Sequence, residues 1–297
     1  MPVALSPRAD PCHASGEPRL MASPTLPPFA DASRRSGEIR LLGYRLHPMT
    51  GDEVVGEIAE AVASGRRLIM ANVNAHAMAT MFDNPPMSRL LEQPDAKVMI
   101  DSMPMLFAAK LAGHRLPRAK RTTSLDFYDT MFRRGAAAGW RFGFVGATPE
   151  TLRKGLVVLR ERYPALDIDG RDGYFDIHDD APGSAQSEIV AWLNERSHDV
   201  VIVGMGMPRQ EEWIERTQHR VGTRVFLSAG AYLDYQAGAQ RVSPRWLGQV
   251  GLEWVYRLAL SPRRLSYRYL IEPCLLLVRL VTRPHPQTRS RAPDGRD

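Results

Sequence analysis

Short apolar segments alternate with amphipathic segments through the middle of the chain, and this alternation limits the fold more than any other feature. The apolar segments are too short for helices and rich in β-branched or aromatic residues, which is typical of buried strands. They span residues 68–73, 97–100, 141–146, 199–204 and 224–228. Segments with helical character lie between or after them, at 54–62, 104–111, 124–139, 149–163 and 208–218. The alternation predicts an α/β fold whose mostly parallel sheet carries helices on both faces.

Three of these helices have recognisable starts. Thr50 and Glu53 have the spacing of a capping box ahead of the first helix. Thr148 precedes Pro149, a pattern of a capping residue followed by proline at the first helical position. Ser124 is the expected cap of the helix that ends near Gly139.

The two ends of the chain differ from this middle region. Residues 1–37 are rich in Pro, Ala, Ser and Arg without a period, so we expect a disordered leader, and we expect residues 284–297 to be a disordered tail. No apolar run of about 7–15 residues follows a basic stretch at the N-terminus, as a secretory signal requires. The most apolar stretch, 269–281, contains Glu272, Pro273 and Arg279 and is shorter than the ~20 residues of a spanning helix. We therefore expect a chain that can lie on a membrane without crossing it.

Composition excludes several classes of protein. With 297 residues, 44% of them hydrophobic, the chain is not collagen, a coiled coil or wholly disordered. Its two cysteines, Cys12 and Cys274, cannot form a disulfide framework, which favours a reducing compartment. Neither cysteine belongs to a metal-ligand cluster, and the eight histidines are scattered, so no metal site is expected.

Polar side chains follow the first two predicted strands, where ligands of parallel sheets bind. Asn74 is placed to hydrogen-bond a substrate, or else to cap the next helix. Asp101 is a candidate general base, or else a helix cap. Arg121 stands before the hydroxyl residues of a helix start, which suits a phosphate or carboxylate, although a solvated basic turn is the commoner meaning of such a cluster.

A glycine-containing block after the strand at 199–204 is a stronger indication of a ligand site. Gly204 and Gly206 allow a ligand to approach the backbone, and Pro208 fixes the start of a helix. The first turn of that helix presents free amides together with Arg209 and Gln210. Gln210 can also be only a polar residue of a first helical turn.

Taken together in their order and spacing, the polar blocks resemble the WecG/TagA/CpsF family of glycosyltransferases (family 26). The resemblance covers about residues 40–272 and rests on 74–76, 101–104, 121–126, Gly146, 172–175, 206–213, 230–234, Gly238, 244–246, 251–258, 262–265 and 268–269. It implies a Rossmann-like core over residues 38–240, no essential metal or other cofactor, and a C-terminal helical appendage over 241–283 that helps to form the site.

The resemblance also implies an activity. Members transfer a sugar, with inversion, from a UDP-sugar donor to an undecaprenyl-diphosphate-linked saccharide acceptor during surface polysaccharide or exopolysaccharide assembly. They work in the cytoplasm at the inner face of the bacterial membrane. The departures of Ser102 and Ser124 from the usual glycines leave an alternative, a non-catalytic nucleotide-binding or scaffold subunit of such an assembly complex. The donor sugar, the acceptor and the oligomeric state, a homo-oligomer included, stay open.

Site residues follow from the same resemblance, position by position. Asp101 matches the proposed catalytic base, and Asn74 matches a polar position near the sugars. Arg121 and Gln210 match positions that bind substrate phosphates or the transferred sugar. The remaining substrate-binding positions are arginines of the appendage, one or two of which would neutralise the UDP leaving group: Arg257, Arg263, Arg264 and Arg268.

The positive charge of the chain is concentrated at its C-terminal end. Residues 241–297 carry eleven arginines, no lysine and four acids, which gives this part a net charge of +7. The total is +6, so residues 1–240 carry a net charge of −1. Aromatic residues lie among these arginines, a composition that suits an anionic membrane surface. No RNA-binding motif supports nucleic acid as the partner. Leu252, Val255 and Leu258 are expected to pack inside the protein.

Overall fold

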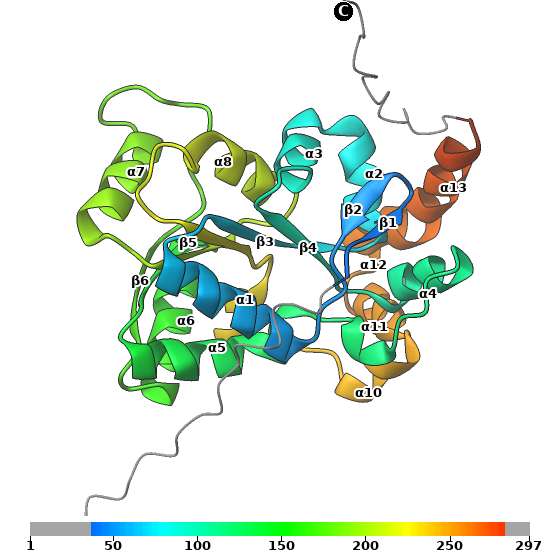
Figure 1. The fold of residues 1–297 in the computed structure, drawn as a ribbon, viewed down its shortest axis with the longest axis horizontal. Helices are drawn as coiled ribbons and strands as arrows, with labels where there is room; N and C mark the ends of the chain where they lie inside the picture. Colours follow the sequence, from blue (N-terminus) through cyan, green and yellow to red (C-terminus); the bar gives the residue numbers. More distant parts are fainter. Residues whose placement is uncertain (1–36, 283–297) are drawn as a thin grey trace, which may run out of the picture.

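The computed structural model describes residues 37–282, and its centre is a six-stranded parallel sheet (Figure 1). The strands follow the order β4-β3-β8-β7-β5-β6, and every neighbouring pair is parallel. Their bounds are β3 Leu68–Val73, β4 Ala96–Ile100, β5 Arg141–Gly146, β6 Asp167–Arg171, β7 Val200–Gly204 and β8 Val225–Ser228. The predicted α/β class is confirmed. The predicted leader and tail lie outside the described residues, except for Gly37.

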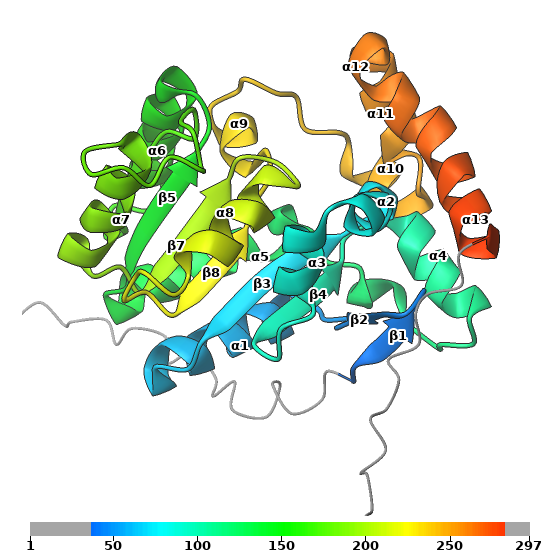
Figure 2. The same ribbon diagram turned by 90° about the horizontal axis from the view of Figure 1, so that it is seen from above.

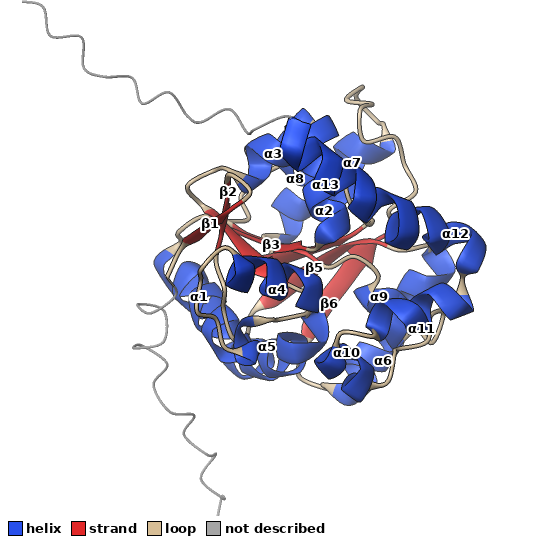
Figure 3. Ribbon diagram, turned by 90° about the vertical axis from the view of Figure 1, so that its right-hand side faces the viewer, coloured by secondary structure: helices blue, strands red, loops and turns tan. Residues whose placement is uncertain are grey.

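Helices cover both faces of the sheet (Figure 3). One face carries α1 Gly51–Ser64, α5 Ser124–Ala138, α6 Pro149–Arg162 and α9 Tyr232–Gln236. The other carries α2 Ala75–Asp83, α3 Pro85–Leu91, α7 Ala185–Arg196 and α8 Arg209–Thr217. Apolar side chains from the strands fill the space on each side, with Phe142 and Ile202 under the first layer and Val201 and Phe226 under the second.

The β4 end of the sheet is closed by a small hairpin and one helix. The hairpin consists of β1 Ile39–Leu41 and β2 Tyr44–Leu46, and the helix is α4 Met103–Leu111. The backbone N–H of His47 donates to the carbonyl of Val98 at 2.7 Å, which ties the hairpin to β4.

The starts of the helices agree with the sequence in two cases and differ in one. Thr50 and Glu53 form the predicted capping box of α1, and Thr148 caps α6. The cap of α5 is Thr123, because the Asp126 carboxylate three residues later accepts hydrogen bonds from the Thr123 N–H and hydroxyl. Ser124 is therefore the first helical residue, and its prediction as the cap was wrong.

A series of helices follows the sheet and lies along its carboxyl edge (Figure 2). They are α10 Arg245–Val250, α11 Glu253–Leu260, α12 Pro262–Ser266, a π-helical segment Tyr267–Ile271 and α13 Glu272–Thr282. The expected division of the chain at residue 241 falls in the loop between α9 and α10. Within residues 37–282, none of the helices combines the length and apolar character needed to cross a bilayer.

Some apolar side chains of these helices are more exposed than the sequence predicted. Leu252 and Val255 are 44% and 43% exposed, so the prediction that they pack inside the protein was wrong; Leu258 is partly buried. Helical spacing identifies residues that share a face, but it does not tell whether that face has a protein neighbour.

Candidate functional site

A large cleft of about 1680 Å³ opens at the carboxyl edge of the sheet. The segments that follow β3, β4, β5, β7 and β8 form its floor, and α11 with the π-helical segment forms its opposite wall. This position agrees with the rule that ligands of parallel sheets bind beyond the carboxyl ends of the strands. Six of the predicted site residues line it: Asn74, Asp101, Arg121, Gln210 and the appendage arginines Arg257 and Arg268.

Asp101 and Asn74 meet in the cleft because β3 and β4 are parallel neighbours. The Asn74 amide donates to Oδ2 of Asp101 at 3.4 Å, while its own Oδ1 accepts the Ala77 N–H at 3.0 Å. Asn74 therefore caps α2 and also lines the cleft. Asp101 caps nothing, since α4 begins at Met103 with Ser102 as its N-cap residue. Within the described part of the chain, Oδ1 of Asp101 is buried and has no hydrogen-bond partner.

The surroundings of Asp101 make its carboxyl group a stronger base than usual. Burial raises the pKa of Asp101 to about 6, because a carboxylate loses hydration in the cleft. The hydrogen bond from Asn74 and the charges of Arg257 and Arg268 lower the pKa of Asp101 but only partly offset the effect of burial. A carboxyl group with this pKa is ionised at neutral pH and still accepts a proton readily.

Arg121 faces the cleft rather than solvent. Its side chain is 16% exposed, and its Nη1 lies 3.9 Å from Oε2 of Glu253 in α11. Arg257, one helical turn after Glu253, donates to the other oxygen of that carboxylate. Glu253 therefore lies between two arginines that come from opposite walls, and the solvated-turn interpretation of Arg121 does not fit.

The remaining appendage arginines occupy different surroundings. Arg268 lies in the π-helical segment, its guanidinium 5.8 Å from the centre of the Tyr269 ring. Its Nε is buried and has no hydrogen-bond partner among residues 37–282. Arg263 is exposed and does not line the cleft, and the side chain of Arg264 lies outside the described residues.

Gln210 is held in one orientation by its neighbours. The side chain is buried, its Nε2 donates to Oε1 of Glu211 at 2.7 Å, and its Oε1 accepts the Gly230 N–H at 3.0 Å. A carboxylate accepts hydrogen bonds only, so Glu211 fixes which end of the Gln210 amide faces Gly230. Burial also raises the pKa of Glu211 to about 7.

Glycines let the backbones of neighbouring strands meet at the floor of the cleft. Gly146 has φ +151°, and a Cβ placed there would lie 2.3 Å from the carbonyl oxygen of Gly204. A Cβ at Gly204 would lie 2.6 Å from the Phe144 ring. The conformation of the turn after β5 is thus fixed by packing.

Several residues of the site were not predicted from the sequence. Glu211, Glu253 and Glu272 are acidic residues within helical patterns and look like solvated ones. Arg209, expected to face a ligand, lines the cleft and also donates to the carbonyls of Gly173 and Phe175, which holds the loop there. The position of Arg209 in the sequence does not predict these hydrogen bonds to the loop. No group of three or more His, Cys, Asp or Glu side chains that could hold a metal occurs within residues 37–282.

Comparisons with known proteins show what this chain is similar to. A family model described as "Glycosyl transferase WecG/TagA/CpsF family" matches residues 39–290. Among curated relatives, the N-acetylglucosaminyldiphosphoundecaprenol N-acetyl-beta-D-mannosaminyltransferases of Staphylococcus aureus strains NCTC 8325 / PS 47 and COL are each 28% identical over 157 residues. The matched region is 52% of this chain and 59% of each relative, so the chain spans about three fifths of their length.

Proposed function

Because the chain belongs to the WecG/TagA/CpsF family of glycosyl transferases, we propose that it transfers a sugar from a UDP-sugar to an undecaprenyl-diphosphate-linked saccharide. The product would serve bacterial surface polysaccharide or exopolysaccharide assembly at the inner face of the cell membrane. Residues 38–240 would form the catalytic core, and residues 241–283 an appendage that completes the site. The names of the staphylococcal relatives support a lipid-linked diphosphate acceptor.

The observation that carries the proposal is the environment of Asp101. Its Oδ2 is held by Asn74, its Oδ1 is unpartnered within the described residues, and its pKa is raised to about 6 by burial. Asp101 would take the proton of the acceptor hydroxyl as that oxygen attacks the anomeric carbon of the donor sugar. Attack from the face opposite to UDP inverts the configuration at that carbon.

Arginines would stabilise the negative charge that develops on UDP as it leaves. Arg121, Arg257 and Arg268 line the same cleft as Asp101. A guanidinium donates in a fork that matches two phosphate oxygens, and it keeps its charge at every physiological pH. These arginines would do the work that a divalent cation does in other transferases, so we propose a metal-independent reaction.

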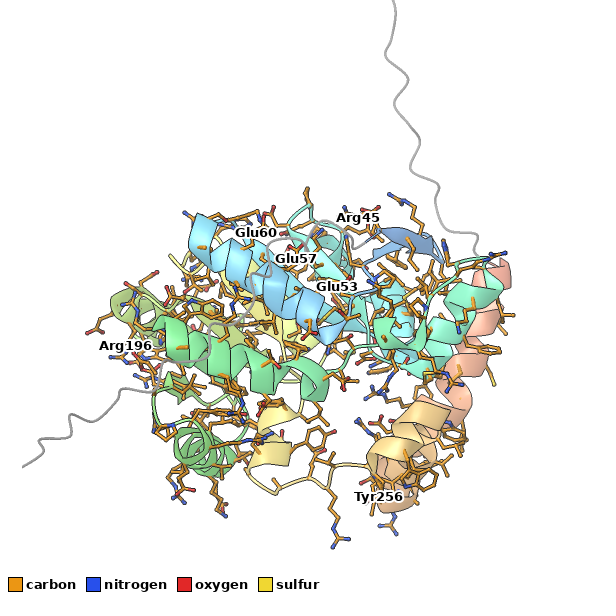
Figure 4. All side chains as sticks on the ribbon, turned by 60° about the horizontal axis from the view of Figure 1, so that its bottom comes forward. Arg45, Glu53, Glu57, Glu60, Arg196 and Tyr256 are labelled. Carbon is orange, nitrogen blue, oxygen red and sulfur yellow. The ribbon has the colours of Figure 1, made fainter. Side chains whose placement is uncertain are left out.

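Gln210 would bind the donor sugar, and the outer surface of the appendage would contact the membrane that holds the acceptor. The fixed amide of Gln210 lines the cleft and is placed to bind a hydroxyl or an acyl group of the donor sugar. Exposed Trp254 and Val255 on α11 would contact the membrane that holds the acceptor lipid. Figure 4 shows Tyr256 on the same helix, projecting at the edge opposite to Glu53, Glu57 and Glu60 of α1.

A donor screen tests the proposal. The purified chain is incubated with UDP-glucose, UDP-N-acetylmannosamine or its uronic acid, and a lipid-diphosphate glycan analogue, while UDP release is followed. Acceptor-dependent UDP release with one donor, unaffected by EDTA, is the expected result. UDP binding without turnover on any acceptor would favour the scaffold alternative, and strong inhibition by EDTA would contradict the metal-independent reaction.

A further inference from the structure

Helix α4, which begins two residues after Asp101, has an apolar outer face. Phe107 is 63% exposed and Leu111 is 79% exposed, and they lie four residues apart on one side of the helix. The opposite side is buried through Met105, Leu106 and Ala109. A helix that is apolar on its covered side and also on its open side lacks the polar face of an ordinary surface helix.

This open face continues onto the appendage. Figures 1 and 2 show α4 and α13 on the same flank of the molecule, and Figure 3 views that flank directly. Helix α10 contacts α4, so the appendage and α4 form adjoining parts of the surface. Large apolar side chains of the π-helical segment and α13 are exposed as well: Tyr267, Leu270, Ile271, Leu275 and Val278.

The segment that contains α4 is also purely basic. Residues 102–125 carry five basic side chains and no acidic one. Lys110, Arg115 and Arg118 are exposed among them. Apolar side chains flanked by exposed cations complement an anionic bilayer, in which apolar groups enter the acyl region and cations meet the headgroups. A protein partner would need acids for the cations, whereas an anionic lipid supplies both kinds of contact.

We propose that α4 is part of the membrane-docking surface, with Phe107 and Leu111 inserted into the bilayer and Lys110, Arg115 and Arg118 on the headgroups. This inference rests on the proposed function, since it assumes a membrane-bound acceptor, but it assigns docking to the core as well as to the appendage. Because α4 follows Asp101 directly, a docked α4 holds the Asp101 carboxylate close to the bilayer surface, where the diphosphate of a lipid-linked acceptor lies.

Vesicle sedimentation tests the inference with the full chain. Vesicles contain phosphatidylglycerol and phosphatidylcholine in equal parts, and the test variant is F107Q/L111Q. The matched control is V157Q, since Val157 is 44% exposed on α6, at the opposite end of the core. All three positions are exposed, so the fold should persist and circular dichroism checks it. We expect the partition coefficient of F107Q/L111Q to fall about tenfold or more, and that of V157Q to stay at the wild-type value.

A second variant separates the charge from the apolar contact. K110Q/R115Q/R118Q should lose about tenfold or more of its binding to the anionic vesicles and little of its weaker binding to pure phosphatidylcholine. Wild-type partition by F107Q/L111Q would overturn the role of α4 while leaving the proposed function intact. If the wild-type chain bound none of the vesicles, the proposal that the protein docks on a membrane would itself be overturned. A dimer that dissociates in F107Q/L111Q without loss of vesicle binding would overturn the inference in favour of a second copy.

Discussion

The imidazole Nδ1 of His76 in α2 lies 2.8 Å from both carboxylate oxygens of Glu272 in α13, although 196 positions separate the two residues. Both side chains are mostly buried, 25% and 14% exposed. Burial and the charge of Arg268 lower the pKa of His76, while the hydrogen bond to Glu272 and the charge of Glu272 act in the opposite direction. The contact ties the appendage to the helix that Asn74 caps.

Removing this contact should loosen the appendage. Glu272→Ala leaves the buried imidazole without a partner and frees α13 from α2, so turnover should fall about tenfold because Arg268 is no longer held in the cleft. Hydrogen exchange across 267–282 should become faster. Cys274→Ser, an exposed change in the same helix, is the control. Unchanged exchange in Glu272→Ala would show that other contacts hold the appendage.

Replacing the proposed base should abolish most of the activity. Asp101→Asn keeps the size of the side chain but cannot accept the proton, so kcat should drop by ~100-fold or more. Steady-state UDP release at saturating donor and acceptor measures it. Glu150→Gln on the surface of α6 serves as the control and should keep wild-type kcat. Near-normal turnover in Asp101→Asn would remove the assignment of Asp101 as base.

The rate should depend on pH through the same carboxyl group. Because a general base acts only when deprotonated, and the pKa of Asp101 is raised to about 6, kcat/KM should rise with pH through about 6 and level off above 7. A profile that is already flat at pH 5, as an ordinary aspartate with a pKa near 4 would give, would contradict the effect of burial. Initial rates at low substrate concentration between about pH 5 and 8 give the profile.

Glu211 should make the protein less stable at high pH. Burial raises the pKa of Glu211 to about 7 in the folded state, so the folded protein binds its proton more tightly than the unfolded chain does. That contribution to stability is fully present below about pH 4.5 and is lost as pH rises through about 7. Glu211→Gln, which stays neutral, should therefore match the wild type near pH 4 and exceed its free energy of unfolding by about 3 kcal/mol at pH 8.

Urea unfolding at pH 4, 6 and 8 measures this difference. Glu215→Gln, one turn along α8, is the control, and its difference from the wild type should be the same at pH 6 and pH 8. If Glu211→Gln also shows no change with pH, the buried carboxyl group is not the origin of the effect. The same variant should raise KM for the donor if the carboxylate orients Gln210.

The two glycines Gly146 and Gly56 should respond to alanine in opposite directions. At Gly146 the backbone has φ +151° and a Cβ would meet the Gly204 carbonyl oxygen, so Gly146→Ala should destabilise the fold by about 3 kcal/mol. Gly56 lies inside α1 with no atom within 4 Å of a Cβ, so Gly56→Ala should stabilise it by about 0.5–1 kcal/mol. Midpoints of urea unfolding decide both. A small effect at Gly146 would mean that β5 and β7 can separate without cost.

The sequence predicted the sheet well because its buried strands are continuous apolar runs. It also placed Asn74 and Asp101 directly after two strands, where ligands of parallel sheets bind, and both residues line the cleft. Strand β6 was missed because it lies at the edge of the sheet, and its residues, Asp-Ile-Asp-Gly-Arg, form no apolar run. Helix patterns alone do not identify which carboxylates become buried by a distant segment.

The appendage shows where sequence reasoning ends. Arg263 and Arg268 look alike in the sequence, yet only Arg268 lines the cleft. Which arginine faces inward depends on how the helix is rotated, and that rotation is set by tertiary contacts such as the one between His76 and Glu272. The exposure of Leu252 and Val255 likewise depends on what covers the helix, which no local pattern records.

The π-helical segment at 267–271 adds a consequence for this rotation. A π-helical turn accommodates an extra residue, and each residue advances a helix by about 100°. If the same five residues formed an ordinary α-helix instead, everything beyond them would be turned by about that angle. Glu272 and the buried Leu276 would swing away from the core together. The π-helical segment thus sets the rotation of the helix that follows it. Because of that rotation, one continuous helix places Arg268 in the cleft and packs Glu272 and Leu276 against the core in the following turns.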